Sequence, residues 1–92
     1  MIKTKKYQIN KGFITQKIDN KITIFSGEDS TLFTLNETAA YIFQGLKLGW
    51  NKQKIIKGLI DSYKITDKKA NDDVDEFTKI LLKKKILEES KS

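Results

Sequence analysis

The chain has 92 residues, no cysteine and no histidine, and its net charge of +6 comes from lysine alone on the basic side. This length predicts one domain, residues 1–92, with an ordered part from about 10 to 88. The missing residue types exclude disulfide frameworks, thiol nucleophiles, most zinc sites and the commonest general base. We therefore expect no catalytic residue, no metal site and no cofactor.

The charged N-terminus has no apolar run behind it, and no segment is long enough to cross a bilayer. We therefore expect a cytoplasmic protein that does not bind membranes. The positive charge favours an acidic partner, although lysines that merely keep a small protein soluble explain it equally well. The absence of arginine argues against reading of guanine edges in DNA.

The first third of the chain is rich in β-branched and aromatic residues. Three runs, 13–18, 22–25 and 31–35, are separated by short polar segments, which predicts an antiparallel three-stranded meander. Residues 1 to about 8 and 88–92 are expected to be mobile chain ends.

After Asn36 the apolar period changes from two to about 3.6, which predicts helices. Asn36 and Asn51 are candidate N-caps of the first two helices, and Gly49 is placed to end the first. A third helix begins at Thr66 or Asp67 and reaches about residue 84. Its expected core stripe, followed by the pair that closes the core, is Ala70, Val74, Phe77, Ile80 and Leu81, then Ile86 and Leu87.

Three strands followed by three helices predict an α+β domain. Asn36 follows Leu35 directly, so the third strand runs into the first helix without a loop, and the small residues Ala39 and Ala40 allow close packing. This short connection leaves the third strand at the border of the sheet, beside a helix.

The strand-to-helix junction resembles a known family. The residues that carry the resemblance are Leu35-Asn36-Glu37-Thr38-Ala39-Ala40-Tyr41-Ile42-Phe43, then Gly49, Ile55-Ile56, Leu59, Tyr63, Asp73-Val74-Asp75-Glu76-Phe77, Leu81 and Ile86-Leu87. Over roughly residues 10 to 88 they are similar to the PqqD family, the recognition elements for precursors of ribosomally made, post-translationally modified peptides. Lys54 and Lys85 depart from residues common in the family, which leaves the subfamily open.

The resemblance implies a winged-helix-turn-helix-like fold that binds the leader segment of a precursor peptide as an added strand, beside the third strand and against the third helix. It implies no catalysis by the domain itself. The partner would be a peptide-modifying enzyme such as a radical enzyme, a cyclase or a leader protease.

Two elements are candidate walls of the peptide groove. Along the third helix, a row one step from the core stripe contains an apolar residue, Leu82, that the core does not use. The third strand, residues 31–35, contains neither a charged residue nor proline, which suits an edge kept available for strand addition. The candidate residues are Thr31, Leu32, Phe33, Thr34 and Leu35 on the strand, and Asn71, Asp75, Thr78, Lys79 and Leu82 on the helix.

Each wall also has a plainer interpretation: Leu82 as a half-buried residue at the helix edge, and the strand as one covered by the N-terminal arm. The acids Asp72, Asp73, Asp75 and Glu76 early in the third helix complement its dipole, and they would repel phosphates if this helix entered a DNA groove. The sequence favours a peptide-recognition protein with no nucleic acid partner. A winged-helix DNA-binding protein is the main alternative, and an enzyme subunit or inhibitor domain is a third.

Overall fold

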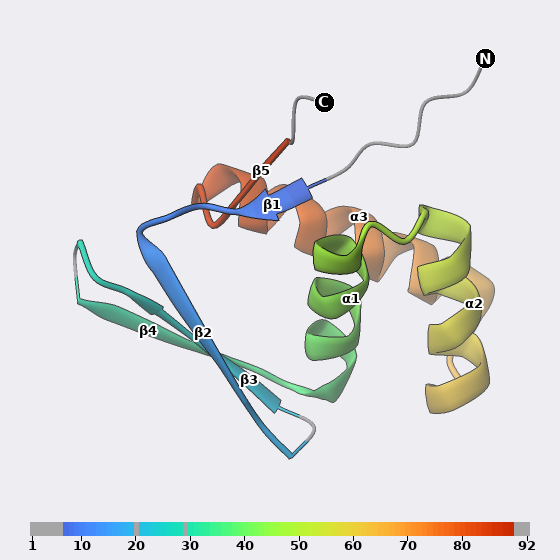
Figure 1. Ribbon diagram of the computed structural model, residues 1–92. Helices are drawn as coiled ribbons and strands as arrows, with labels where there is room; N and C mark the ends of the chain where they lie inside the picture. The colour runs from blue at the N-terminus through green and yellow to red at the C-terminus, as the bar shows by residue number, and fades with distance from the viewer. Residues whose placement is uncertain (1–6, 20, 29, 90–92) are drawn as a thin grey trace.

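The computed structural model describes residues 7–19, 21–28 and 30–89. The chain forms two small sheets and three helices; α1 packs against one face of the larger sheet, and α2 and α3 pack against α1 and against each other (Figure 1). In chain order the elements are β1 (Tyr7–Ile9), β2 (Phe13–Ile18), β3 (Lys21–Ser26), β4 (Thr31–Leu35), α1 (Glu37–Leu48), α2 (Lys52–Tyr63), α3 (Asp67–Lys83) and β5 (Leu87–Glu89). The fold is α+β, as predicted.

The larger sheet is the expected antiparallel meander in the order β2-β3-β4. Its side chains alternate between two faces, and Ile22 and Ile24 of β3 are buried under the helices. Strand β4 pairs with β3, and no described strand pairs with its other edge. The predicted border position of this strand is confirmed.

Each helix begins at a side chain that accepts a backbone N–H of the first turn. Asn36 Oδ1 accepts from the amide of Ala39 at 2.9 Å, and Asn51 Oδ1 accepts from Lys54 at 2.8 Å. Thr66, rather than Asp67, caps α3. Gly49 ends α1 with φ of 82°, in the left-handed region that glycine adopts without strain. The predicted caps of α1 and α2 are therefore confirmed.

The core lies between the inner face of the larger sheet and the three helices. Its most completely buried large side chains are Phe43, Ile24, Ile42, Ile55, Leu59, Leu81, Ile86 and Leu87. One member of the predicted α3 stripe is misplaced, because Ile80 is 41% exposed. Within the described residues, no helix combines the length and the apolar character that a bilayer span requires.

The second sheet, β1 with β5, was not predicted from the sequence. Strand β1 pairs antiparallel with β5, with Ile9 opposite Leu87, so the first and last described residues lie side by side (Figure 1). Asn10 strengthens this contact by donating its side-chain N–H to the carbonyl of Lys85 at 3.0 Å. The expectation of mobile ends is therefore wrong for residues 7–8 and 88–89, and for residues 1–6 and 90–92 it lies outside the described residues.

Candidate functional site

Helix α3 has two exposed flanks on either side of its buried stripe, Ala70, Val74 and Leu81. Because an α-helix turns about 100° per residue, Asp73, Phe77 and Ile80 lie on one flank and Asp75, Thr78 and Leu82 on the other. We call the first set the β4-side flank and the second the α2-side flank. Each flank borders a hollow of its own.

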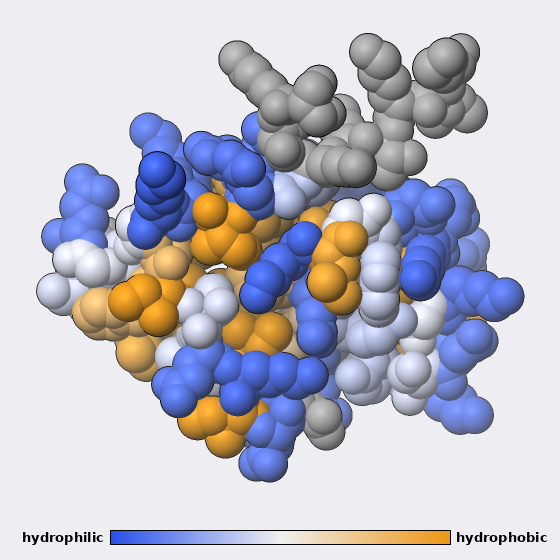
Figure 2. Space-filling view, viewed as in Figure 1, coloured by the Kyte–Doolittle hydropathy of each residue, from blue (hydrophilic) through white to orange (hydrophobic). Residues whose placement is uncertain are grey.

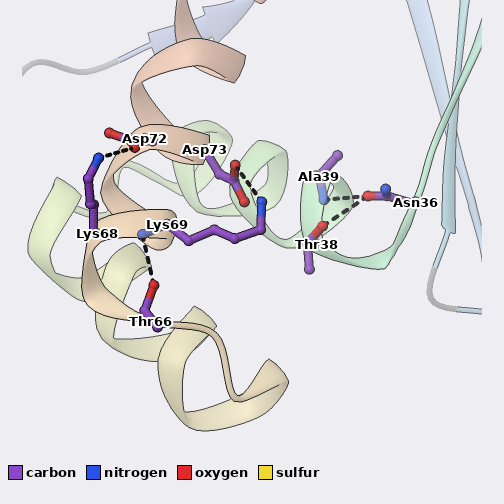
Figure 3. A network of polar contacts seen from close by, with 8 residues as sticks. All are labelled: Asn36, Thr38, Ala39, Thr66, Lys68, Lys69, Asp72 and Asp73. Atoms are coloured by element: carbon purple, nitrogen blue, oxygen red, sulfur yellow. Dashed lines mark hydrogen bonds and ion pairs between the residues drawn. The ribbon is translucent and has the colours of Figure 1, made fainter.

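The β4-side hollow has a volume of about 470 Å³ and lies between α1 and α3. Its polar rim includes Lys69, which donates to Asp73 Oδ1 at 3.4 Å on the side facing the start of α1 (Figure 3). Its floor is apolar and includes Phe77 and Ile80. The lining residues are Asn36, Thr38, Ala39, Ile42, Ile65, Lys69, Asp73, Glu76, Phe77 and Ile80.

Two contacts place β4 on this side of α3. Asn36 directly follows β4 and lines the hollow, so the strand enters α1 at its rim. At the other end of α3, Lys84 Nζ lies 5.0 Å from the ring centroid of Phe33, the central residue of β4. This cation–π contact bridges the end of α3 to the strand.

The α2-side pocket is larger, about 670 Å³, and lies between α3, the start of α2 and Tyr7 of β1. Trp50 contributes an aromatic wall that packs against Tyr41, with ring centroids 5.6 Å apart. Lys52 Nζ and Asp75 Oδ1 form an ion pair of 2.7 Å at its rim. The lining residues are Tyr7, Leu46, Trp50, Asn51, Lys52, Gln53, Ile55, Val74, Asp75, Thr78, Lys79 and Leu82.

The structure separates the two predicted walls of the peptide groove. Of the predicted helix row, Asp75, Thr78, Lys79 and Leu82 line the α2-side pocket, and none of the residues 31–35 lines either hollow; β4 approaches the opposite flank of α3 through Asn36 and the Phe33–Lys84 contact. Asn71 is half-buried and donates to the carbonyl of Asp67 at 3.2 Å, outside both linings. The part that each set plays in peptide binding stays a prediction.

The residues that sequence reasoning missed are those that α3 turns toward β4: Asp73, Glu76, Phe77, Ile80 and Lys84. The helical period had assigned Phe77 and Ile80 to the core. Both residues lie at the edge of the core stripe by helical phase, and this position was the one sign in the sequence of partial exposure.

Three of the acids of α3, Asp72, Asp73 and Asp75, form ion pairs with lysines. Lys68 pairs with Asp72 at 3.2 Å and Lys69 with Asp73 at 3.4 Å, each one turn apart on the helix (Figure 3). Among the described residues, no group of three or more histidine, cysteine or acidic side chains comes together as metal ligands. These carboxylates therefore act as ion-pair partners on the helix surface.

Comparison with solved structures supports the fold assignment. A structure described as "TbiB1 in Complex with the TbiA(beta) Leader Peptide" is similar with a TM-score of 0.77 and 20% identity, covering 92% of this chain and 99% of that one. A second, "Lasso peptide synthetase B1 complexed with the leader peptide", gives a TM-score of 0.81 and 19% identity, covering 90% and 98%. At these identities the likeness establishes a shared fold.

Comparison by sequence gives the family. No curated protein matches the chain. The family described as "Coenzyme PQQ synthesis protein D (PqqD)" matches residues 22–87, which include all of β3 except its first residue, β4, the three helices and the first residue of β5. Because this match covers well over half of the sequence and includes both flanks of α3, the chain belongs to the PqqD family.

Proposed function

We propose that this chain is a non-catalytic, cytoplasmic recognition domain that binds the leader segment of a ribosomally made precursor peptide. It presents the peptide to a modifying enzyme, such as a radical enzyme, a cyclase or a leader protease. Two observations support this: the chain belongs to the PqqD family, and both similar structures are described as complexes with a leader peptide.

The outer edge of β4 is the observation that carries the proposal. An edge strand is normally blunted by charge or proline, and β4, with the sequence TLFTL, contains neither. A peptide strand paired along this edge would gain main-chain hydrogen bonds, and its alternate side chains would need pockets. The leader therefore extends the order β2-β3-β4 by one strand.

The β4-side hollow supplies such pockets. Ile80 is 41% exposed and Phe77 is half-buried, so both offer apolar surface at the base of the hollow. Lys69 lines the hollow near the start of α3, and Lys84, which directly follows α3, contacts Phe33 of β4. We place the apolar anchors of the leader on Phe77 and Ile80.

The outer face of the larger sheet is the surface we propose for the modifying enzyme. Ile14, Phe25 and Leu32 lie opposite one another across β2, β3 and β4, and they are 66%, 38% and 63% exposed. In Figure 2, hydrophobic surface gathers toward the left of the view, over the sheet. Because Leu32 belongs to β4, an enzyme on this face would also touch a leader strand added beside it.

Titration with the leader of the precursor encoded beside this chain's gene tests the proposal. In nuclear magnetic resonance spectra, the amides of residues 31–35 should shift together with those of Phe77 and Ile80. Ile80→Asp should weaken binding at least about tenfold, or roughly 1.4 kcal/mol, because it places a carboxylate at an apolar anchor. Leu48→Asp is the matched control, since Leu48 is an exposed leucine outside both hollows.

Other outcomes would redirect the assignment. Leader-induced shifts confined to α2 would contradict strand addition at β4. Salt-dependent binding to duplex DNA without affinity for any leader would favour the winged-helix DNA-binding alternative. For the enzyme surface, Ile14→Lys should leave leader affinity unchanged and weaken capture of the enzyme by the domain–leader complex, whereas Gln16→Lys, on the same face of β2, should have a smaller effect.

A further inference from the structure

The α2-side pocket has the properties of a binding site that the leader strand at β4 does not use. Trp50, Leu46 and Ile55 give it apolar walls, and Leu82 closes its α3 side. Its volume of about 670 Å³ is enough for a large side chain and its neighbours. Its charged residues, Lys52, Asp75 and Lys79, are exposed, so an apolar group could enter without leaving a buried charge unpaired.

The charged residues at the rim indicate which kind of ligand the pocket would attract. Asp75 is already paired with Lys52. The ion pairs among described residues do not involve Lys79, which lines the pocket and is exposed. The available charge is therefore positive, and it would attract a carboxylate beside the apolar group.

A path leads from the β4-side flank to this pocket. Ile80 and Leu82 lie on opposite sides of α3, and helical phase places Lys79 and Lys83 on the solvent-facing arc between them, with the exposed Glu76 on the same arc one turn closer to the start of the helix. Both lysines are exposed, and neither takes part in an ion pair among the described residues. An extended peptide spans this arc, on the order of 10–15 Å, with about four residues.

We propose that the precursor peptide makes a second anchorage in the α2-side pocket. After pairing with β4, the peptide crosses the outer face of α3 with acidic residues against Lys79 and Lys83, and it inserts a large apolar side chain beside Trp50 and Leu82. This inference rests on the proposed function and adds to it the chemistry of a second recognised segment, which is acidic and then apolar. It also assigns a binding role to Lys79 and Leu82, which belong to the helix row predicted from the sequence, on the α2-side flank.

The test compares two peptides from the precursor encoded beside this chain's gene. One is the complete precursor, and the other is the shortest fragment that still shifts the amides of residues 31–35. Trp50 is the single tryptophan of the chain, so its fluorescence reports on the pocket. The complete precursor should change that fluorescence and bind at least about tenfold more tightly than the fragment, because linked anchors add to affinity. The fragment should leave the fluorescence unchanged.

Variants of the full chain then locate the second anchor. Lys79→Glu and Leu82→Asp should each remove most of the affinity gain of the complete precursor while leaving fragment binding within about twofold of wild type. Lys57→Glu is the matched control, since it reverses the charge of an exposed lysine on α2 that lines neither hollow and takes part in no ion pair among the described residues. Lys79 is exposed, so the Lys79→Glu variant decides the question even if Leu82→Asp weakens the fold.

The outcomes separate the two proposals. A fragment that binds at β4, with a complete precursor that leaves Trp50 unchanged or gains no affinity, overturns the second anchorage and leaves leader recognition intact. Absence of any binding at β4 overturns the proposed function. A Trp50 response to the modifying enzyme or to a second copy of this chain, with none to the precursor, assigns the pocket to that occupant and also overturns the second anchorage.

Discussion

The two flanks of α3 are similar in composition and different in surroundings. Each presents apolar side chains, and each has a lysine–aspartate pair at its rim, Lys69 with Asp73 on one side and Lys52 with Asp75 on the other. Only the β4-side flank adjoins a strand edge that no described strand covers. We therefore expect the neighbouring element, more than the residues on the helix, to decide which flank receives a peptide as a strand.

The largest loss of stability is expected at Leu81, which lies in the buried stripe between the two flanks and is 2% exposed. Leu81→Asp would bury a carboxylate without a partner and should cost several kcal/mol, enough to unfold most of so small a domain. Circular dichroism melts measure this loss. A variant that melts like wild type would show that the buried stripe, and with it the division into two flanks, is misplaced.

Substitution of Gly58 in α2 should cause the next largest loss of stability, and it should disturb only the α2-side pocket. A Cβ built there would lie 2.6 Å from Cζ of the Tyr41 ring, which packs against Trp50. Gly58→Ala should cost about 1–3 kcal/mol in chemical denaturation and alter Trp50 fluorescence, with leader binding at β4 unchanged.

The Tyr41→Ala background supplies the control for this change. With the ring removed, Gly58→Ala should become neutral or stabilise by up to about 1 kcal/mol, because alanine has the higher helix propensity. The same destabilisation in both backgrounds would mean that contact with Tyr41 is not its cause.

Most of the larger sheet and all three helices could be predicted because their causes are local. Alternation defines the strands, and the side-chain oxygens of Asn36 and Asn51 define where two helices begin. The β1–β5 pair could not be predicted in this way. Each strand has three residues, too few for a period, and their partners lie about 80 residues apart in the sequence.

The candidate site was predicted in part for a related reason. Composition and border position identified β4, and helical phase correctly separated buried Leu81 from half-buried Leu82. Phase gives the angle of each side chain about the helix axis and contains nothing about which neighbour lies at that angle. The sequence therefore could not reveal that Ile80, and not Leu82, stands on the flank that β4 adjoins.

A smaller loss of stability is expected when either capping asparagine is replaced, and one of them lies at each hollow. Asn36 lines the β4-side hollow and Asn51 the α2-side pocket. Replacing either with alanine should cost about 1 kcal/mol in thermal melts, since a first-turn amide loses its acceptor. Asn36→Ala should in addition weaken binding of the short fragment that pairs with β4, whereas Asn51→Ala should leave the binding of that fragment unchanged. The cap-preserving Asn36→Asp should retain most of the stability, and equal losses for both Asn36 variants would contradict a capping role.

The smallest effects are expected from the two ion pairs at the rims. Lys52–Asp75 joins α2 to α3 at 2.7 Å with side chains 43% and 61% exposed, whereas Lys69–Asp73 lies within α3 at 3.4 Å. Because water screens exposed pairs, Lys69→Ala should cost no more than about 0.5 kcal/mol and Lys52→Ala no more than about 1 kcal/mol. Denaturation at low and at 1 M salt measures both, and high salt should reduce each loss. A salt-insensitive loss above about 2 kcal/mol for Lys52→Ala would mean that this lysine holds α2 against α3 through the packing of its stem, and that the α2-side pocket depends on it for its shape.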